Sequence, residues 1–134
     1  MATKTSPKVA AGVQPKSLSV GLVAVTATYS ANTSSLSSGD VIQMVKVPKG
    51  GTPIYVGVAG GMGKVRIDVG DGGDDDRYLA DKSASAAMGL APINTAYVPY
   101  TYSVDDTIDI TVSVVSVSTA GGVFHMIAIF AMDT

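Results

Sequence analysis

Apolar and polar residues alternate along several short stretches of the chain, as they do in β-strands that bury one face. The alternation is clearest in TIDITVSV, residues 107–114, where isoleucine and valine are separated by aspartate, threonine and serine. KVRIDV, residues 64–69, repeats the pattern with Lys64, Arg66 and Asp68 on the polar side. Both stretches therefore predict strands with one face in a core and the other in water.

Three further runs predict strands by their content of valine, isoleucine, threonine and tyrosine. They are VGLVAVTATY, VIQMVKV and IYVGVA, residues Val20–Tyr29, Val41–Val47 and Ile54–Ala59. Pro48 ends the second run because proline has no N–H to donate to a strand pair. Lys49, Gly50 and Gly51 then supply a turn, so the second and third runs are predicted to form a hairpin.

The last run, VFHMIAIFA from Val123 to Ala131, is apolar on both faces. This pattern fits a central strand between two layers, or a strand with one face buried against another subunit. A break in alternation occurs where Val115 directly follows Val114, and it predicts a bulge or a change of sheet near that step.

Seven or eight short strands separated by Gly, Ser and Pro loops predict an all-β fold, an antiparallel β-sandwich or jelly roll. The 134 residues suffice for one core. Residues 18–134 are assigned to this domain, and residues 1–17 to an extended N-terminal arm. The arm carries Lys4, Lys8 and Lys16 with two prolines and little apolar surface, so it is either ordered by a partner or a frayed end.

Composition narrows the choice of partners and chemistry. All 11 acidic residues are aspartate, cysteine is absent, and the formal net charge is −2. Nucleic acid is not expected as a partner because binding phosphates takes a basic surface. No export signal is expected, and the longest apolar run is far short of the ~20 residues that cross a bilayer as a helix, so no membrane partner is expected.

The stretch GDGGDDDR, residues 70–77, allows two interpretations. Asp71, Asp74 and Asp76 are candidate calcium ligands, although the spacing does not match an EF-hand. The alternative is a wide β-turn, in which glycines relax the backbone, aspartates accept hydrogen bonds from backbone amides, and Arg77 pairs with one of them. We favour the turn and expect no metal and no cofactor.

No catalytic residues are predicted. A hydrated, glycine-rich loop does not raise a carboxyl pKa enough to make a general acid. The single histidine, His125, lies in the most apolar run and is expected to be buried, and no serine lies in a G-x-S-x-G motif. Tyr97, Tyr100 and Tyr102 are candidates for a sugar-stacking platform, although cross-strand tyrosine pairs beside Pro99 are the favoured interpretation.

Three phrases of the sequence resemble the small decoration, or cement, proteins of tailed-bacteriophage capsids. They are SSGDVIQMVKVPKGGTPIYV from Ser37 to Val56, IDVGDGGDDDRYL from Ile67 to Leu79, and VPYTYSVDDTIDITV from Val98 to Val112, followed by the apolar final strand. The resemblance covers residues 37–132. These phrases are structural rather than catalytic, so the resemblance implies a fold and a surface and no enzyme activity.

The resemblance implies a β-sandwich that associates with itself, as a dimer or trimer, and binds the major capsid protein on the outer surface of the virion head after synthesis in the host cytoplasm. Apart from the resemblance, the charges of the N-terminal arm make Lys4, Lys8 and Lys16 the expected capsid contacts. The alternative function is a carbohydrate- or calcium-binding β-sandwich module that uses Tyr97, Tyr100 and Tyr102 with Asp71, Asp74 and Asp76.

Overall fold

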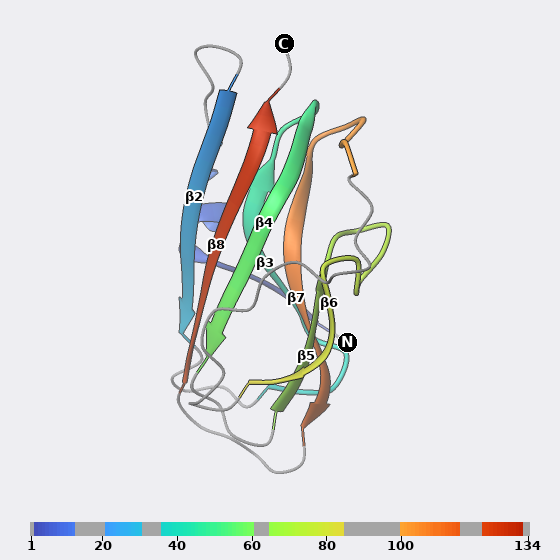
Figure 1. The fold of residues 1–134 in the computed structure, drawn as a ribbon. Helices are drawn as coiled ribbons and strands as arrows, with labels where there is room; N and C mark the ends of the chain where they lie inside the picture. Colours follow the sequence, from blue (N-terminus) through green and yellow to red (C-terminus); the bar gives the residue numbers. More distant parts are fainter. Residues whose placement is uncertain are drawn as a thin grey trace.

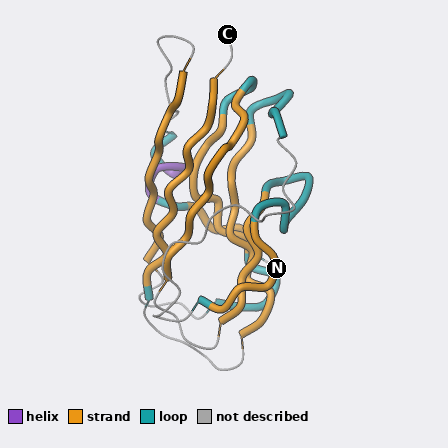
Figure 2. The backbone as a smooth tube through the Cα atoms, viewed as in Figure 1, coloured by secondary structure: helices purple, strands orange, loops and turns teal. Residues whose placement is uncertain are grey.

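The protein is a sandwich of two β-sheets, as seen in a computed structural model (Figure 1). The structure describes residues 2–12, 21–30, 36–60, 65–84, 100–115 and 122–132. Figure 2 shows how far strands dominate these residues, with one short helix among them. No helix in this part of the chain has the length and apolar character needed to cross a membrane.

Eight strands and one helix make up the described elements. In chain order they are β1 Thr3–Thr5, α1 Pro7–Ala10, β2 Gly21–Ser30, β3 Val41–Val47, β4 Gly51–Gly60, β5 Val65–Gly70, β6 Leu79–Ser83, β7 Asp106–Val115 and β8 Val123–Met132. Every run that the alternation pattern marked as a strand is a strand, with ends shifted by a few residues. The all-β sandwich is confirmed, and the jelly-roll connectivity stays a prediction.

One sheet has five strands in the order β1-β3-β7-β5-β6, and the other has three in the order β2-β8-β4. All neighbouring strands are antiparallel except β1 and β3, which are parallel. Figure 1 shows β2, β8 and β4 side by side in one layer, with β3, β7 and β5 in the layer behind.

The predicted hairpin of β3 and β4 is wrong. The turn itself forms, with the Gly51 N–H donating to the Pro48 carbonyl at 3.0 Å and Gly50 at φ 90°. However, β3 pairs with β1 and β7 while β4 pairs with β8. The turn carries the chain from one sheet to the other because both strands have apolar residues to place in a core between two layers.

The core lies between the sheets and is made of buried apolar residues from both. Ile67, Ile108 and Ile110 face Phe124 and Phe130, all of them fully buried. The predicted irregularity in β7 is present: β5 and β7 change register where Arg66 pairs with Val114 and Ile67 with Val112. The residue of β7 without an opposite partner is Ser113, just before the predicted step from Val114 to Val115.

β8 is the central strand of the three-stranded sheet, and only one of its faces is covered by the other sheet. Its even-numbered side chains, such as Phe124 and Phe130, enter the core, whereas His125, Ile127 and Ile129 face outward. His125 is therefore exposed, contrary to the expectation from its apolar neighbours. Its Nδ1 lies 3.2 Å from Thr28 Oγ1 on β2.

The described part of the N-terminal segment, residues 2–12, lies on the domain. β1 extends the five-stranded sheet beside β3, and the Ser6 hydroxyl, fully buried, donates to the Met44 carbonyl at 2.6 Å. The proposed boundary between arm and domain, at residues 17 and 18, lies outside the described residues. The division therefore stays a prediction.

Candidate functional site

The aspartate-rich loop joins β5 to β6 and folds back on the end of β5. A β-carbon at Gly70 would lie 2.0 Å from the Asp74 carbonyl oxygen, so only glycine allows the loop to approach this closely. The Asp71 N–H donates to that same carbonyl at 2.8 Å. Asp71 Oδ1 in turn accepts from the backbone N–H groups of Gly73 and Asp74, each at 3.0 Å. The predicted turn with aspartate-to-backbone hydrogen bonds is confirmed.

Asp71 is the buried centre of the loop, with 1% of its side chain exposed. Arg77 Nε donates to Asp71 Oδ2 at 2.6 Å, and the Tyr102 hydroxyl donates to the same oxygen at 2.8 Å. The Tyr102 hydroxyl also lies 2.6 Å from that of Tyr78, which is fully buried. The guanidinium carbon of Arg77 lies 3.8 Å from the centre of the Tyr100 ring. One carboxylate thus ties the loop to the segment that leads into β7.

Asp71 and Arg77 form an ion pair in which each charge stabilises the other. Burial alone would raise the pKa of Asp71, but the hydrogen bonds from Arg77, Tyr102 and Gly73 outweigh it and the pKa is lowered. The hydrogen bond to Asp71 raises the pKa of Arg77. Burial, followed by the neighbouring Tyr78 and Asp71, raises the pKa of Tyr102. Asp71 is therefore ionised and Tyr102 neutral near pH 7, and neither is poised to exchange a proton.

The proposed calcium ligands are not brought together as a set. Asp71 turns inward to Arg77, whereas Asp74, Asp75 and Asp76 gather on the outside with carboxylate oxygens within 4.8 Å of one another. A hydrogen bond with Asp74, then burial and the surrounding carboxylates, raises the pKa of Asp76. This outer cluster is an acidic turn in water, and Arg77 Nη1, 3.9 Å from Asp74 Oδ2, offsets part of its charge.

The tyrosines are structural anchors within the described residues. Tyr102 is buried and hydrogen-bonded to Tyr78 and Asp71, and its ring meets that of Tyr100 edge-on at 5.0 Å. They lie in an irregular segment rather than in paired strands, so the cross-strand interpretation is wrong for these two. Tyr97 lies outside the described residues.

Asp109 is a buried titratable residue that the sequence pattern placed in water. It faces outward from β7, yet it is only 6% exposed because it lies in a hollow of about 430 Å³ between the sheet and the aspartate loop. The hollow is lined by Thr3, Gly39, Val41, Gln43, Asp71, Gly72, Asp75, Asp109 and Thr111. Burial raises the pKa of Asp109 to about 7; the Thr107 hydroxyl, which donates to it at 2.7 Å, opposes the shift, and Asp106 and Asp71 add to it.

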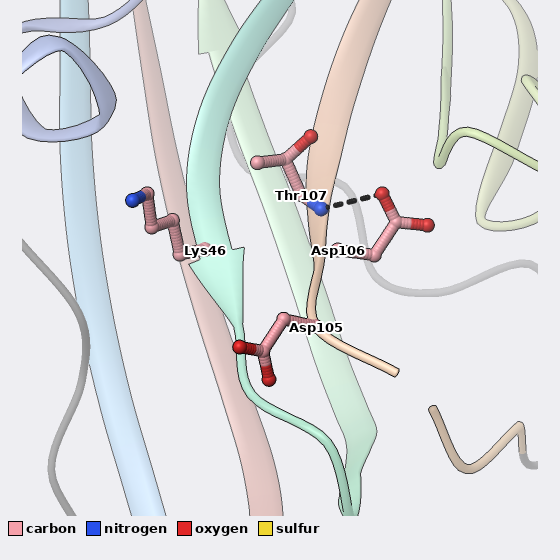
Figure 3. A pocket seen from close by; sticks show the side chains of 4 residues that line it. All are labelled: Lys46, Asp105, Asp106 and Thr107. Carbon is pink, nitrogen blue, oxygen red and sulfur yellow. Dashed lines mark hydrogen bonds between the residues drawn. The ribbon is translucent and has the colours of Figure 1, made fainter. Parts of the chain in front are cut away.

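A second, shallower hollow of about 200 Å³ lies where β3 ends and β7 begins, lined by Lys46, Asp105, Asp106 and Thr107 (Figure 3). The side chains in it do not converge: the carboxylates of Asp105 and Asp106 point to opposite sides in Figure 3. Asp106 Oδ1 accepts from the Thr107 N–H and Asp105 Oδ1 from the Lys49 N–H, both at 2.8 Å. Both carboxylates cap backbone groups, and Asp105 ties the turn beside Pro48 to the start of β7.

The lysines predicted to contact a capsid are placed differently from one another. Lys4 Nζ lies 3.7 Å from Asp40 Oδ2, and 24% of its side chain is exposed. Burial would raise the pKa of Asp40, but the backbone amides of Ser37 and Ala2 and the charge of Lys4 lower it. Lys8 is half-buried in α1, and Lys16 lies outside the described residues. Lys4 thus helps to hold β1 on the domain.

Within the described part of the chain, these groups form caps, turns and ion pairs. The aspartates that come closest together either accept backbone hydrogen bonds or face water, and the lone histidine sits on an open sheet face. Such an arrangement offers rigid surfaces, and within it burial raises the pKa of Asp109 to about 7.

Comparison with solved structures gives the fold a context. The chain is similar to a chain in the capsid of Ralstonia phage GP4, with a TM-score of 0.77 and 15% identity over 98% of this chain and 99% of that one. A chain in the cyanophage Pam1 capsid asymmetric unit has a TM-score of 0.73 and 17% identity, covering 90% and 91% of the two chains. A chain in the acid-stable capsid of Helicobacter pylori bacteriophage KHP30 has a TM-score of 0.53 and 16% identity, covering 82% and 93%.

No protein-family model and no curated protein matches the sequence. At 15–17% identity the likeness is one of fold: this chain has a sandwich that also occurs in phage capsids.

Proposed function

We propose that this protein is a capsid cement, or decoration, protein that binds the outer surface of a phage head and stabilises contacts between major capsid subunits. The observation that carries the proposal is the match, over nearly the full length of both chains, to a chain of a phage capsid. The three phrases of sequence that resemble cement proteins favour the same role. In this role the protein associates with itself as a dimer or trimer and acts through its surfaces.

The physical mechanism is added interface. A head filled with DNA fails at the seams between subunits, and a protein that bridges a seam must be released before the seam opens. A specific interface buries roughly 1,000 Å² or more, and binding only to the closed seam stabilises it by mass action. Copies bound around the head multiply the effect.

A rigid domain suits this role. The buried Asp71–Arg77 pair and the hydroxyls of Tyr78 and Tyr102 fix the loops at one end of the five-stranded sheet. A surface that is already ordered loses less entropy on binding than a flexible one. The protein can therefore convert more of its contact energy into stabilisation of the head.

The N-terminal segment is the proposed capsid contact, through Lys4, Lys8 and Lys16 and acidic groups on the shell. Because Lys4 and Ser6 hold β1 on the domain, deleting the segment would also disturb the five-stranded sheet. Lys8→Glu/Lys16→Glu is a sharper test, since it leaves the Lys4–Asp40 pair intact. Weaker co-sedimentation with heads is expected. Lys49→Glu/Lys82→Glu, which changes two exposed lysines elsewhere, is the matched control.

The head role itself is tested on purified particles. The protein should be present in a fixed number of copies per head, and heads stripped of it should release DNA at a lower temperature, as followed with a DNA-binding dye. Adding the purified protein back should restore the release temperature. The role would be refuted by particles that lack the protein, or by heads that release DNA at the same temperature with and without it.

The alternative, a calcium- or carbohydrate-binding module, is tested by melting the isolated protein with millimolar calcium and with glycans. The observation that favours calcium is the external cluster of Asp74, Asp75 and Asp76, whose carboxylate oxygens lie within 4.8 Å of one another. The cement role predicts an unchanged melting temperature in both additions. A rise of several degrees that Asp74→Asn/Asp76→Asn abolishes would favour the binding module.

A further inference from the structure

The two sheets have four edges, and three of them are protected against pairing with another strand. β1 spans only Thr3–Thr5. β6 carries Asp81, a non-glycine residue at φ 52°, next to the charged Lys82. β4 contains Pro53 and a register break beside it, and its first residue already accepts a hydrogen bond from the Tyr102 N–H at 3.0 Å. Short strands, charges, prolines and bulges are the usual means of preventing edge pairing.

The fourth edge, β2, has none of these features. It runs for ten residues as GLVAVTATYS, without a charged residue or a proline. Its pairing with β8 is unbroken from Gly21 opposite Met132 to Ser30 opposite Val123. Within the described part of the chain, the backbone ladder of residues 22–29 runs to β8 alone. A long, straight, uncharged edge is a template for another strand.

Of the described elements, α1 contacts β2, yet most side chains of β2 remain exposed or half-buried. Val23, Val25 and Tyr29 point into the sandwich and pack against the core, yet they are only partly buried. Leu22 on the opposite face is 69% exposed. A strand added beside β2 would cover the open flanks of the inward-facing residues.

We propose that β2 pairs antiparallel with β2 of a second copy, so that two three-stranded sheets join into one six-stranded sheet across a two-fold axis. The proposal rests on the self-association in the proposed function and assigns it to a surface. A two-fold contact brings each residue of the strand opposite another residue of the same strand. The strand must therefore be compatible with itself.

The residues of β2 meet that requirement. Directly opposed residues in an antiparallel pair share a face, which allows two central registers: Val25 opposite Val25 of the partner copy, or Thr26 opposite its own counterpart. The first pairs Leu22 with Thr28 and Val23 with Ala27, and the second pairs Val23 with Tyr29. Neither register places like charges in contact, and each offers up to about ten backbone hydrogen bonds.

The test is the oligomeric state of the isolated full-length protein. Sedimentation velocity from micromolar to about 100 µM should show a dimer for the natural sequence. Ala24→Lys/Thr26→Lys should raise the dissociation constant at least about tenfold, because either register brings the added charges together at the axis. Circular dichroism and a melting curve confirm that the variant is folded. A natural sequence that stays monomeric at every concentration would overturn the proposal.

Ile54→Lys/Ala59→Lys is the matched control on β4, the far edge of the same sheet. Ala59 and Ala24 share the outer face of that sheet through their pairing with β8. Edge pairing predicts that this control remains a dimer. If it dissociates as much as the β2 variant does, the copies pack face to face and the edge proposal is wrong.

Cross-linking tests the same contact by the gain of a covalent dimer rather than by weakening the interface. The chain has no cysteine, so Ala24→Cys/Thr26→Cys places the only thiols at the axis. Mild oxidation should yield a covalent dimer in either register, since opposed residues lie within the distance that a disulfide spans. Ala59→Cys should stay uncoupled, and equal cross-linking of both variants would contradict the edge.

These measurements use protein without heads, so their failure is distinct from failure of the proposed function. A protein that dimerises through β2 but is missing from phage particles leaves the edge standing and removes the cement role. A protein that binds heads but shows neither a dimer nor a cross-link leaves the cement role standing and removes the edge proposal.

Discussion

The outer faces of the two sheets are built from different chemistry. The five-stranded sheet presents Lys46, Arg66 and Asp68, with the buried Asp109 among them and the aspartate loop folded across one end. The outer residues of the three-stranded sheet include no charged group among those described, and their titratable side chains are His125 and Tyr55. The first face is held together by charge pairs, whereas the second relies on backbone pairing and apolar contact.

Because of this difference, the two faces should govern different properties: one the stability of the fold, the other the association between copies. Buried charges tolerate little change, because removing one partner leaves the other without compensation. An uncharged open face tolerates substitution in the monomer, but its side chains decide what can lie against it. Substitutions on the five-stranded side should therefore change folding and its pH dependence, and substitutions on the other face should change contacts between copies.

Arg77→Met should produce the largest effect. It leaves the Asp71 carboxylate, with 1% of its side chain exposed, without its cation, and breaking a buried pair in this way costs roughly 3–5 kcal/mol. Urea unfolding followed by circular dichroism measures the loss. Arg66→Met is the control, since the Arg66–Asp81 pair is exposed and its removal should leave the curve unchanged. Similar losses from both would mean that Asp71 is not the centre of the loop.

Asp109→Asn should stabilise the protein at neutral and alkaline pH. Because the pKa of Asp109 is raised to about 7 in the folded state, against about 3.9 in an unfolded chain, the wild-type stability should decline as pH rises from about 4 to 7. The shift corresponds to a few kcal/mol at most; access of water to the hollow reduces this, and we expect about 2 kcal/mol at pH 8.

Melting temperatures of the two proteins from pH 4 to pH 8 check this. The curves should approach each other toward pH 4, where the carboxyl group is protonated in the folded state and about half protonated in the unfolded chain, and separate above it. An Asn variant that is no more stable than the wild type at pH 8 would show that water already solvates Asp109 in the hollow.

Asp109 also marks the limit of what the sequence predicts. Alternation along β7 correctly assigns Ile108 and Ile110 to the core, because that depends only on neighbours along one strand. It wrongly assigns Asp109 to water, because the cover comes from β1 and the aspartate loop, far away in sequence. The β3–β4 hairpin failed for the same reason: a turn fixes a change of direction but not the sheet that receives the next strand.

The turn in the aspartate loop was predictable, since Gly70 and the Asx hydrogen bonds of Asp71 are local. The choice of Asp71 as the buried member was not. It depends on Tyr102, which donates to Asp71 from 31 residues away in the sequence. Likewise, no local signal in residues 1–12 shows that Asp40 accepts hydrogen bonds from this segment.

Asp40→Asn should have an intermediate effect, by loosening the N-terminal segment. The carboxylate accepts from the Ala2 N–H at 3.2 Å and the Ser37 N–H at 3.0 Å, with Lys4 beside it. Losing the charge should cost about 1 kcal/mol. Because the pKa of Asp40 is lowered on folding, the wild type should lose this advantage as pH falls below about 4. Proteolysis at Lys4 and Lys8 should accelerate in the variant at pH 7. Unchanged proteolysis rates would show that Asp40 does not hold the N-terminal segment on the domain.

Thr28→Val should have the smallest effect and tests the other side of the comparison. It removes an exposed hydrogen bond to His125, and an exposed polar contact of this kind changes stability by no more than about 0.5 kcal/mol. The same substitution replaces a hydroxyl by a methyl group, which extends the apolar surface beside Ile127 and keeps a β-branched residue in the strand. We therefore expect an unchanged melting temperature from pH 5 to pH 8, together with association at least as strong as that of the natural sequence in sedimentation velocity. A loss of several degrees would mean that the three-stranded face also depends on a polar network, and the contrast between the two faces would no longer hold.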